Sequence, residues 1–400
     1  MEPCVLRPRP AGMAHTRARG AAARLLPSRP LAALRSLRRG WAGAAVTGAA
    51  LPAAAAAAAA LARPGNSRAS TANAALPVPR DATPAAPALP SGTPTLKVLS
   101  WNVAGLRALL RREGGAAVLR GVLAAQRPDI TFLQEHKLQE SHLAEIEPTL
   151  LEIFDSAAAC AASHQATWAV STSRKGYSGT CAIYHAGAGG GVLRAAAGEV
   201  DDVDAMEGRT VRLDLACGLV VVGAYVPNAG TGLKRLDYRV DSWDEHLRAY
   251  LLRLGAEEAS EASDALRPRR VLLCGDLNVA MDADVWCPGE SRLKRQAGTS
   301  PKERASFART LQEVGLVDAW RWRHQGAKGV YTYWCQRTKS RPLNRGMRLD
   351  YFLGEGRLFP EAEGSSTGGS RNGAVIVHDS AVLDDVMGSD HCPITCTLRL

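Results

Sequence analysis

The sequence predicts one large α/β domain with two packed β-sheets, preceded by a segment of different composition. Short apolar runs that are typical of strands recur through residues 95–400. Many of these runs are apolar throughout, as in sheets that are covered on both faces. Amphipathic stretches with helical spacing lie between them. We therefore expect a single domain over residues 95–400, with residues 1–94 as a separate segment.

The expected strands number ten. In chain order they are residues 96–101, 129–135, 166–171, 179–185, 209–215, 219–226, 269–277, 348–353, 374–379 and 393–400. Helices are expected over residues 105–126, 243–254 and 301–314. Ser300 is the expected N-cap of the last helix, and Glu303 completes a capping box. Residues 256–268 and 361–373 are predicted to be surface insertions.

Residues 1–94 hold the whole formal charge of the chain, which is +10. They contain twelve Arg, no Lys and two acidic residues, whereas basic and acidic residues are equal in number over residues 95–400. A segment that is rich in Arg and Ala and poor in acids is typical of an organelle transit peptide, here with a disordered linker behind it. The composition fits a chloroplast or a mitochondrion equally well.

Other interpretations of this segment stay open. It is also compatible with low-complexity sequence that carries no address, or with a nuclear protein. The uncharged stretch from Gly40 to Ala62 is mostly Ala and is interrupted by Pro52, so it falls short of a membrane span and we expect no membrane association. The nine cysteines show no C-x-x-C pair and no zinc spacing, which fits a reducing compartment.

Polar residues stand at the ends of six apolar strands. They are Asn102, Glu135, Tyr225 with Asn228, Asp276 with Asn278, Asp350, and Asp390 with His391. One such residue is typical of a turn, but six would form a polar floor if their strands share a sheet edge. Carboxylate and amide oxygens with a single histidine favour Mg²⁺ or Mn²⁺ over zinc. The pattern predicts metal-dependent hydrolysis of a phosphodiester or phosphomonoester.

The chemistry of each residue type suggests a division of labour on that floor. Asp276 with Asn278 can orient or deprotonate an attacking water. His391, held by a carboxylate such as Asp350, can donate a proton to a phosphoryl oxygen as negative charge develops there. Tyr225, together with the neighbouring asparagine at 228, adds neutral donors around the same phosphate.

Ten motifs together resemble those of one family. In chain order they are LSWNVAGLRA, ITFLQEHK, GYSGT, EGRTVR, AYVPNAG, CGDLNVA, SPKERASF, YTYW, RLDYFL and GSDHCPI. From about Leu96 to the C-terminus the chain resembles the exonuclease III family of apurinic/apyrimidinic endonucleases, in the endonuclease/exonuclease/phosphatase superfamily. The resemblance implies a four-layer αββα sandwich of two packed mixed β-sheets flanked by helices. It also implies Mg²⁺-dependent incision of double-stranded DNA 5′ to abasic sites during base excision repair, with Mn²⁺ as a substitute metal.

The resemblance assigns roles to individual residues. The implied metal ligands are Asn102, Glu135, Asp276, Asn278, Asp390 and His391. The implied catalytic residues are Tyr225, Asn228, Asp276, Asn278, Asp350 and His391. The implied DNA contacts are Tyr177, Arg209, Arg235, Tyr333 and Trp334. Among these, Asp276 matches the general base, Asn278 the transition-state stabiliser and Glu135 the principal metal ligand.

Three positions depart from the family's pattern. Ala104 stands where relatives have Asp or Asn next to the metal site, so the metal affinity is in question. Thr231 stands where animal relatives place an Arg that inserts into DNA. Met347 replaces a Trp of the abasic pocket, although Tyr333 and Trp334 keep its aromatic wall. These changes bear on product retention and on the balance of endonuclease, 3′–5′ exonuclease and 3′-phosphodiesterase activities.

Charge is distributed unevenly within the domain. Residues 292–348 contain fourteen Lys and Arg against three acidic residues, which predicts a basic surface for phosphates. Aromatic residues are interleaved with these charges and either stack on nucleic acid or lie in the core. Two other functions stay open: a different phosphoesterase of the superfamily, such as an inositol phosphatase or deadenylase, and a DNA-binding paralogue with weakened catalysis. We expect a monomer, with base excision repair proteins as its partners.

Overall fold

A computed structural model describes residues 77–157, 163–257, 270–286, 289–360 and 375–400. The predicted transit peptide and the stretch from Gly40 to Ala62 lie outside the described residues, as do nearly all of the predicted insertions at 256–268 and 361–373. Among the described residues, no helix is both long enough and apolar enough to cross a membrane.

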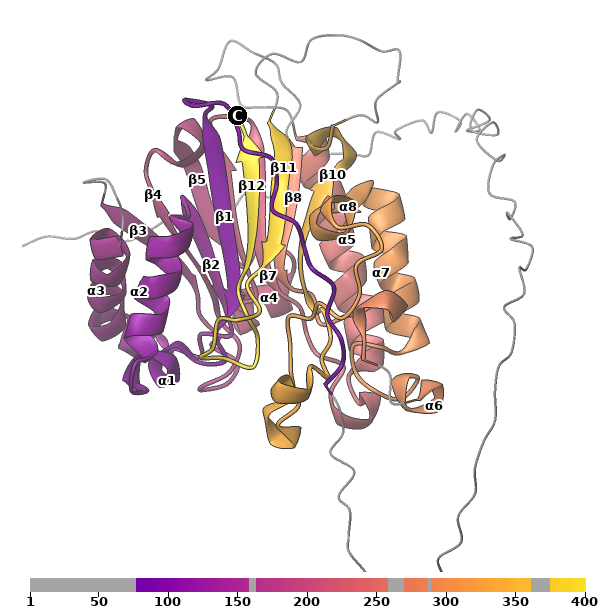
Figure 1. Ribbon diagram of the computed structural model, residues 1–400. Helices are drawn as coiled ribbons and strands as arrows, with labels where there is room; N and C mark the ends of the chain where they lie inside the picture. The colour runs from indigo at the N-terminus through magenta and orange to yellow at the C-terminus, as the bar shows by residue number, and fades with distance from the viewer. Residues whose placement is uncertain (1–76, 158–162, 258–269, 287–288, 361–374) are drawn as a thin grey trace, which may run out of the picture. The chain divides into compact units, whose positions relative to one another are not determined.

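Two six-stranded mixed sheets pack face to face (Figure 1). The first has the order β11-β12-β1-β2-β4-β3, with β1 (Thr95–Asn102), β2 (Ile130–Gln134), β3 (His164–Ala169), β4 (Thr180–His185), β11 (Ile376–Val382) and β12 (Ile394–Arg399). The second has the order β5-β6-β7-β8-β10-β9, with β5 (Val192–Ala197), β6 (Thr210–Leu215), β7 (Leu219–Tyr225), β8 (Arg270–Asp276), β9 (Leu316–Asp318) and β10 (Asp350–Glu355). Each sheet has one parallel pair near its centre, β1 with β2 and β7 with β8, and its other pairs are antiparallel.

Helices cover the outer face of each sheet. The α-helices are α1 (Leu106–Arg111), α2 (Gly115–Gln126), α3 (Glu140–Ala157), α4 (Asp202–Glu207), α5 (Asp244–Ala256), α6 (Glu290–Leu293), α7 (Pro301–Val314) and α8 (Ala319–Arg323). Helices α1 to α3 pack on the first sheet, and α5 and α7 pack on the second. The fold is therefore the four-layer αββα sandwich that the resemblance implies.

Both faces of the central strands are buried, which explains their continuous apolar runs. On β1, Leu96 and Val98 point into the core between the sheets, whereas Leu99 and Trp101 point into the core under the helices. All four side chains have no exposed surface. The alternation of one strand between two cores is the physical reason that the strands could be found from apolar content alone.

All ten predicted strands are present, but some elements differ from the prediction. The helix expected over residues 105–126 is two helices, α1 and α2, because the chain turns at Gly114, where φ is +73°. Strands β5 and β9, helix α3 and the short helices α4, α6 and α8 were not predicted. Strand β5 is largely exposed at a sheet edge, and α3 contains Pro148, a residue that argues against a helix interior.

The predicted start of helix α7 is confirmed. Ser300 has the extended backbone of an N-cap, its hydroxyl accepts a hydrogen bond from the Glu303 N–H, and the Glu303 carboxylate accepts from the Ser300 N–H. These are the two reciprocal bonds of a capping box. The cap fixes where α7 begins against the second sheet.

Residues 77–94, the described part of the predicted linker, form neither helix nor strand. None of them is buried. They run along the surface of the domain to the start of β1 and make hydrogen bonds to residues between 323 and 344 and to His378 (Figure 1). This part of the predicted linker therefore packs on the surface of the sandwich.

The close approach of the two sheets can be tested at Gly223 in β7. A Cβ at this position would lie 2.0 Å from Cδ1 of Phe132 on the facing sheet. Gly223→Ala should lower the free energy of unfolding by about 1–3 kcal/mol, because a rigid ring would have to move. Denaturant titration measures the change. Gly121→Ala in α2 is the control, since a Cβ there meets no atom within 4 Å and should stabilise the helix. Equal stability of the two variants would contradict the packing described above.

Candidate active site

The two parallel strand pairs bring the predicted polar residues together at one end of the sandwich. Asn102 ends β1, Glu135 follows β2, and Tyr225 and Asp276 end β7 and β8. In the second sheet, Asp276 lies beside Tyr225 on one neighbouring strand and beside Asp350 on the other. The polar floor predicted from the strand ends therefore forms across both sheets.

Sharp turns at the strand ends aim these side chains at one another. Ala104, Glu135 and Asn278, each just beyond a strand, have left-handed backbones with φ of +50°, +56° and +49°. This conformation is easy for Asn but unfavourable by roughly 1 kcal/mol for Ala and Glu. Unfavourable backbone conformations of this kind concentrate at functional sites.

Asn102 links the two sheets. Its Nδ2 donates to Glu135 Oε2 at 3.2 Å and to Asp276 Oδ2 at 2.9 Å, while its Oδ1 accepts from the Ala104 N–H at 3.0 Å. Asn102 is fully buried. In this structure its amide nitrogen, not its oxygen, faces the two carboxylates, so its predicted role as a metal ligand requires the amide to turn.

A chain of amides continues from Asp276 toward the surface. The Asn278 N–H donates to Asp276 Oδ1 at 2.9 Å, and Asn278 Nδ2 donates to the backbone carbonyl of Val226 at 2.9 Å and more weakly to Asp276 Oδ2 at 3.3 Å. Asn228 in turn donates from Nδ2 to Asn278 Oδ1 at 2.8 Å. Asn228 and Asn278, predicted at the ends of two different strands, thus form one hydrogen-bonded unit beside the carboxylate.

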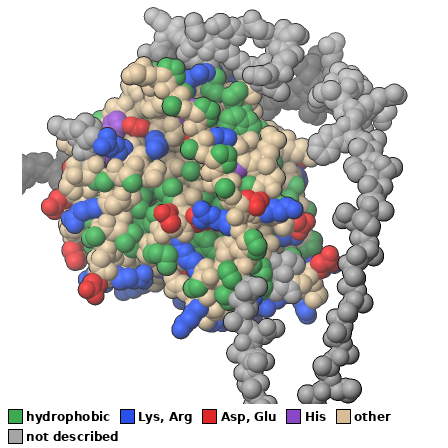
Figure 2. All heavy atoms as spheres, in the orientation of Figure 1, with side chains coloured by type: hydrophobic (Ala, Val, Ile, Leu, Met, Phe, Trp, Pro, Cys, Tyr) green, Lys and Arg blue, Asp and Glu red, His purple; other side chains and the backbone are tan. Residues whose placement is uncertain are grey.

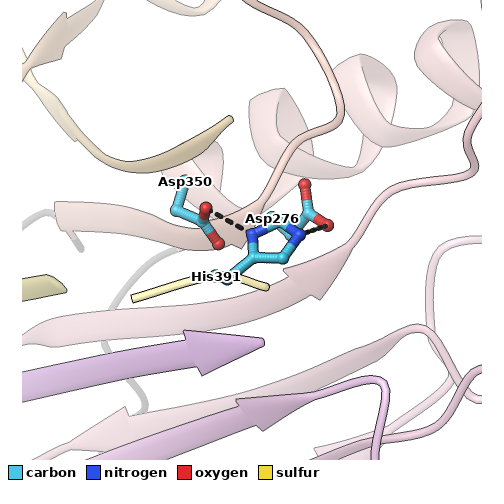
Figure 3. Close-up of side chains that lie close together, drawn as sticks. All are labelled: Asp276, Asp350 and His391. Carbon is cyan, nitrogen blue, oxygen red and sulfur yellow. Dashed lines mark hydrogen bonds and ion pairs between the residues drawn. The ribbon is translucent and has the colours of Figure 1, made fainter. Parts of the chain in front are cut away.

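His391 lies between two aspartates (Figure 3). Its Nδ1 lies 2.7 Å from Asp350 Oδ2, and its Nε2 lies 3.8 Å from Asp276 Oδ2. Burial alone would lower the pKa of His391, but the charges of Asp350 and Asp276 outweigh it and raise the pKa to about 10. The imidazole is therefore protonated at neutral pH, with Asp350 holding its orientation.

Asp276 and Tyr225 also have perturbed proton affinities. Burial raises the pKa of Asp276 to about 7, an effect that His391 opposes and Asp350 reinforces. The pKa of the Tyr225 hydroxyl lies well above its ordinary value, because of burial and then because of the negative charges of Glu135 and Asp276. Tyr225 is therefore a hydrogen-bond donor, and Asp276 is a carboxylate that accepts a proton near neutral pH.

Tyr177, Arg209 and Arg235 form a cluster beside Tyr225. The Tyr177 hydroxyl accepts from Arg209 Nη2 and from Arg235 Nη1, each at 2.7 Å. Arg209 is buried, donates from Nη1 to the Tyr225 carbonyl at 2.9 Å, and stacks over the Tyr225 ring at 5.0 Å. Arg235 and Tyr177 are half-buried. Arg209 therefore holds Tyr177 and Tyr225 from the buried side, whereas Tyr177 and Arg235 reach the surface.

The predicted aromatic wall lies next to His391. The Tyr333 ring centroid is 4.9 Å from that of His391, and Tyr333 pairs through its backbone with both His391 and Met347. Trp334 is buried, and its backbone N–H donates to the Asp390 carbonyl at 2.9 Å. The wall, Met347 and Asp390 are thus contiguous with His391 and, through it, with Asp350.

The basic stretch at 292–348 is partly neutralised by the fold. Lys302, Arg304, Arg309, Arg321 and Arg348 each form ion pairs with acidic residues. Trp320, one of the interleaved aromatics, is a core residue. Exposed basic side chains of this stretch remain at 292, 294, 295, 328, 337 and 339. Figure 2 shows Lys and Arg interspersed with acids over the face in view.

The donor set suits a hard divalent ion. Glu135, Asp276 and Asp390 offer carboxylate oxygens, and the asparagines offer amide oxygens, as Mg²⁺ and Mn²⁺ require. One group in the described residues, Asp276 with Asp350 and His391, has three ligand atoms within 4.8 Å of one another. The short bond between His391 and Asp350 occupies that pair, which leaves the carboxylates of Glu135 and Asp276 as the better ligands.

Three neighbours of the site were not singled out from the sequence. Lys137 Nζ lies 2.9 Å from Glu135 Oε1 and 3.3 Å from the Ala104 carbonyl. Glu207 accepts from Arg209 and Arg235 and so offsets one of their two positive charges. Both stand within motifs quoted above, ITFLQEHK and EGRTVR. Ser389 Oγ donates to the Asn102 carbonyl at 2.8 Å and joins the last loop to β1.

The comparisons with known proteins agree with this geometry. The sequence profile of the Endonuclease/Exonuclease/phosphatase family matches residues 99–391. The chain belongs to this family. This chain is 33% identical over 306 residues to an exodeoxyribonuclease of Bacillus subtilis, and the alignment covers 76% of this chain and 100% of that protein. It is 34% identical over 306 residues to the DNA repair nuclease APEX1 of Danio rerio, covering 76% of this chain and 83% of that protein.

Solved structures include one of matching architecture. The crystal structure of the AP endonuclease LMAP from Leishmania major has a TM-score of 0.64 and 31% sequence identity. The match covers 82% of this chain and 93% of that one. The site between the sheets lies within residues 99–391 that match the family profile, as do all strands of both sheets except the first half of β1 and the whole of β12.

The orientation of His391 by Asp350 can be tested without metal or substrate. Asp350→Asn removes a negative charge that favours the imidazolium, so His391 should lose its proton at a lower pH than in the wild type. Nitrogen NMR of the imidazole, followed from neutral to alkaline pH in chelator, measures the change. Asp390→Asn should have a smaller effect, since Asp390 contributes least among the neighbours named for His391. Titration of His391 at the same pH in wild type and Asp350→Asn would contradict the pairing.

Proposed function

We propose that this chain is a metal-dependent endonuclease that cleaves double-stranded DNA on the 5′ side of abasic sites and leaves a 3′ hydroxyl. The observation that carries the proposal is the opposition of Asp276, a carboxylate with raised pKa, to His391, an imidazolium held by Asp350. Relatives named as DNA repair nuclease and as DNA-(apurinic or apyrimidinic site) endonuclease support the choice of DNA among phosphate esters.

The proposed chemistry follows from the protonation states. Asp276 accepts a proton from the attacking water while its other oxygen is held by Asn102. The imidazolium of His391 and the hydroxyl of Tyr225 donate to phosphoryl oxygens as negative charge grows on them. Asn278, fixed by Val226, holds the Asp276 carboxylate in place by donating to it from its backbone N–H. Each group is oriented before substrate arrives, which is the condition for electrostatic stabilisation of a transition state.

We propose Mg²⁺ as the metal, with Mn²⁺ as a substitute. Glu135 and Asp276 would hold it, with Asn102, Asn278 and Asp390 as the further predicted ligands. His391 was also predicted as a ligand, but its imidazolium has no lone pair to offer a metal and serves as a donor instead. When bound, such an ion polarises a phosphoryl oxygen and stabilises the leaving oxygen. The protein's own part is to hold the two carboxylates in place, and the amide of Asn102, which donates to both, does this in the structure.

DNA would lie over the loops that surround the site. Exposed basic residues flank the predicted contacts: Arg174 and Lys175 precede Tyr177, and Lys234 precedes Arg235. Such residues act on phosphates, so binding should weaken steeply with salt. Tyr333, part-exposed beside His391, offers an aromatic face to a sugar that lacks its base. Relatives named exodeoxyribonuclease make 3′–5′ exonuclease activity part of the proposal.

The first test uses a labelled duplex with one tetrahydrofuran abasic analogue. Incision 5′ to the analogue is expected with Mg²⁺ and with Mn²⁺, and none in chelator. Asp276→Asn and His391→Ala should each reduce turnover by on the order of a thousandfold, equivalent to about 4 kcal/mol. Asp282→Asn is the matched control, because this exposed aspartate lies outside the site and should leave turnover unchanged.

Other outcomes would point to different functions. Hydrolysis of an inositol phosphate or of poly(A), with no incision of abasic DNA, would replace the proposal with another phosphoesterase activity. Tight binding of abasic DNA without cleavage in either metal would indicate a DNA-binding paralogue. A loss of less than tenfold in Asp276→Asn would sink the assignment of Asp276 as the base.

Because position 104 carries Ala and no carboxylate, we make a separate prediction about the affinity of the site for metal. Lys137 contacts both Glu135 and the Ala104 carbonyl, so its ammonium group competes with a metal ion for the Glu135 carboxylate. Ala104→Asp would add a ligand oxygen and a second partner for Lys137. It should bind Mn²⁺ at least several-fold more tightly, as measured by calorimetry on the protein without DNA. Ala108→Asp, on the neighbouring helix α1, controls for added charge, and equal affinity of the two variants would contradict the prediction.

A further inference from the structure

The segment at 78–81, which we call the N-terminal strap, clasps one loop of the catalytic domain. The Val78 N–H donates to the Leu343 carbonyl at 2.9 Å, and the Val78 carbonyl accepts from Asn344 Nδ2 at 3.2 Å. The Asp81 N–H donates to the Lys328 carbonyl at 3.0 Å, and the Lys328 N–H donates to Asp81 Oδ2 at 2.8 Å. Two reciprocal pairs of hydrogen bonds therefore join the strap to the start of the loop at 328–347 and to residues near its end.

The loop is shaped to receive the strap. A Cβ at Gly329 would lie 2.1 Å from the Pro79 carbonyl oxygen and 3.1 Å from Arg80 Cα, so the strap passes in direct contact with the backbone there. Gly329 also has a φ of +73°, which glycine adopts freely. Prolines at 77 and 79 fix the extended backbone of the strap in advance and so reduce the entropy lost on docking.

Asn344 connects the strap to the aromatic wall of the site. Its Nδ2 donates to the Val78 carbonyl and, at 2.8 Å, to the Gly329 carbonyl, while its Oδ1 accepts from the Trp334 indole N–H at 3.2 Å. One amide group thus holds the strap and Trp334 together. Trp334 is adjacent in sequence to Tyr333, whose ring lies against His391.

A second connection runs through the loop that carries His391. The Arg80 guanidinium pairs with the Asp384 carboxylate. The Asp384 carbonyl accepts from Arg341 Nη2 at 2.8 Å, and the Arg341 guanidinium stacks on the Trp334 ring at 4.4 Å. Both connections from the strap therefore end at Trp334, although they pass through different residues.

We propose that the N-terminal strap is a positioning element for substrate recognition, which fixes the loop at 328–347 and its aromatic wall in the geometry that receives DNA. No residue of 77–94 is buried, so the strap adds little to the core of the domain. The hydrogen bonds of the strap are instead made to the loop at 328–347. The consequence for DNA rests on the function proposed above, whereas the ordering of the loop by the strap does not.

Two variants of the full-length protein loosen the strap at opposite ends of its contact with the loop. Asp81→Ala removes the acceptor of the Lys328 N–H. Asn344→Asp keeps an acceptor for the Trp334 indole but loses both donors, and Asp tolerates the left-handed backbone found at Asn344, where φ is +46°. Ser91→Ala, an exposed residue between the strap and β1, is the matched control.

Hydrogen exchange without DNA measures the loop, and steady-state kinetics on the tetrahydrofuran duplex measures its use. Both variants should exchange faster over residues 328–347 and at the wild-type rate over β8. KM should rise about fivefold with kcat within about twofold of wild type, because the lost bonds order the recognition loop and not the catalytic groups. The control should match the wild type in both measurements.

Three results would overturn the proposal. They are unchanged exchange over residues 328–347 in both variants, faster exchange with unchanged KM, and a loss confined to kcat. A wild-type protein that cuts no abasic DNA would refute the proposed function, and the exchange comparison would still decide whether the strap orders the loop.

Discussion

The site depends on keeping the Asp276 carboxylate between two sheets with its charge compensated. Moving a carboxylate out of water without partners is strongly unfavourable, so a buried one must be hydrogen-bonded, paired or protonated. Asn102 approaches it from the first sheet, Asn278 from the turn after β8, and His391 from the loop before β12. Each partner comes from a different part of the chain, and the relative placement of the two sheets therefore determines the proton affinity of the site.

The arrangement of strands makes that convergence possible. Each sheet has one parallel pair near its centre, and the carboxyl ends of both pairs lie at the same end of the sandwich. A connection at such an end must turn sharply if its side chain is to reach the middle. The left-handed backbones of Glu135 and Asn278 accomplish this turn, and His136, directly after Glu135, anchors it by accepting from the Leu138 N–H at Nδ1.

Strands that are buried along their whole length could be predicted from the sequence. Contacts between residues that are far apart in the chain could not. Central strands such as β1 and β8 could be predicted because both of their faces are covered, whereas edge strand β5 has exposed residues and no distinct pattern. Strand ends identified the polar residues of the site, but not which atoms face one another. The amide of Asn102 turned toward two carboxylates depends on contacts across two sheets, which no local pattern encodes.

Tyr177 shows how neighbours can restrict the chemistry of one group. A phenol normally both donates and accepts hydrogen bonds. In this protein its oxygen already accepts from Arg209 and Arg235, so only its O–H remains for a third partner. That partner must be an acceptor, such as an anionic oxygen, because an ammonium or amide N–H would find no lone pair. The two arginines thus leave the Tyr177 hydroxyl able only to donate. At this point of the surface the protein therefore selects groups that accept a hydrogen bond over groups that donate one.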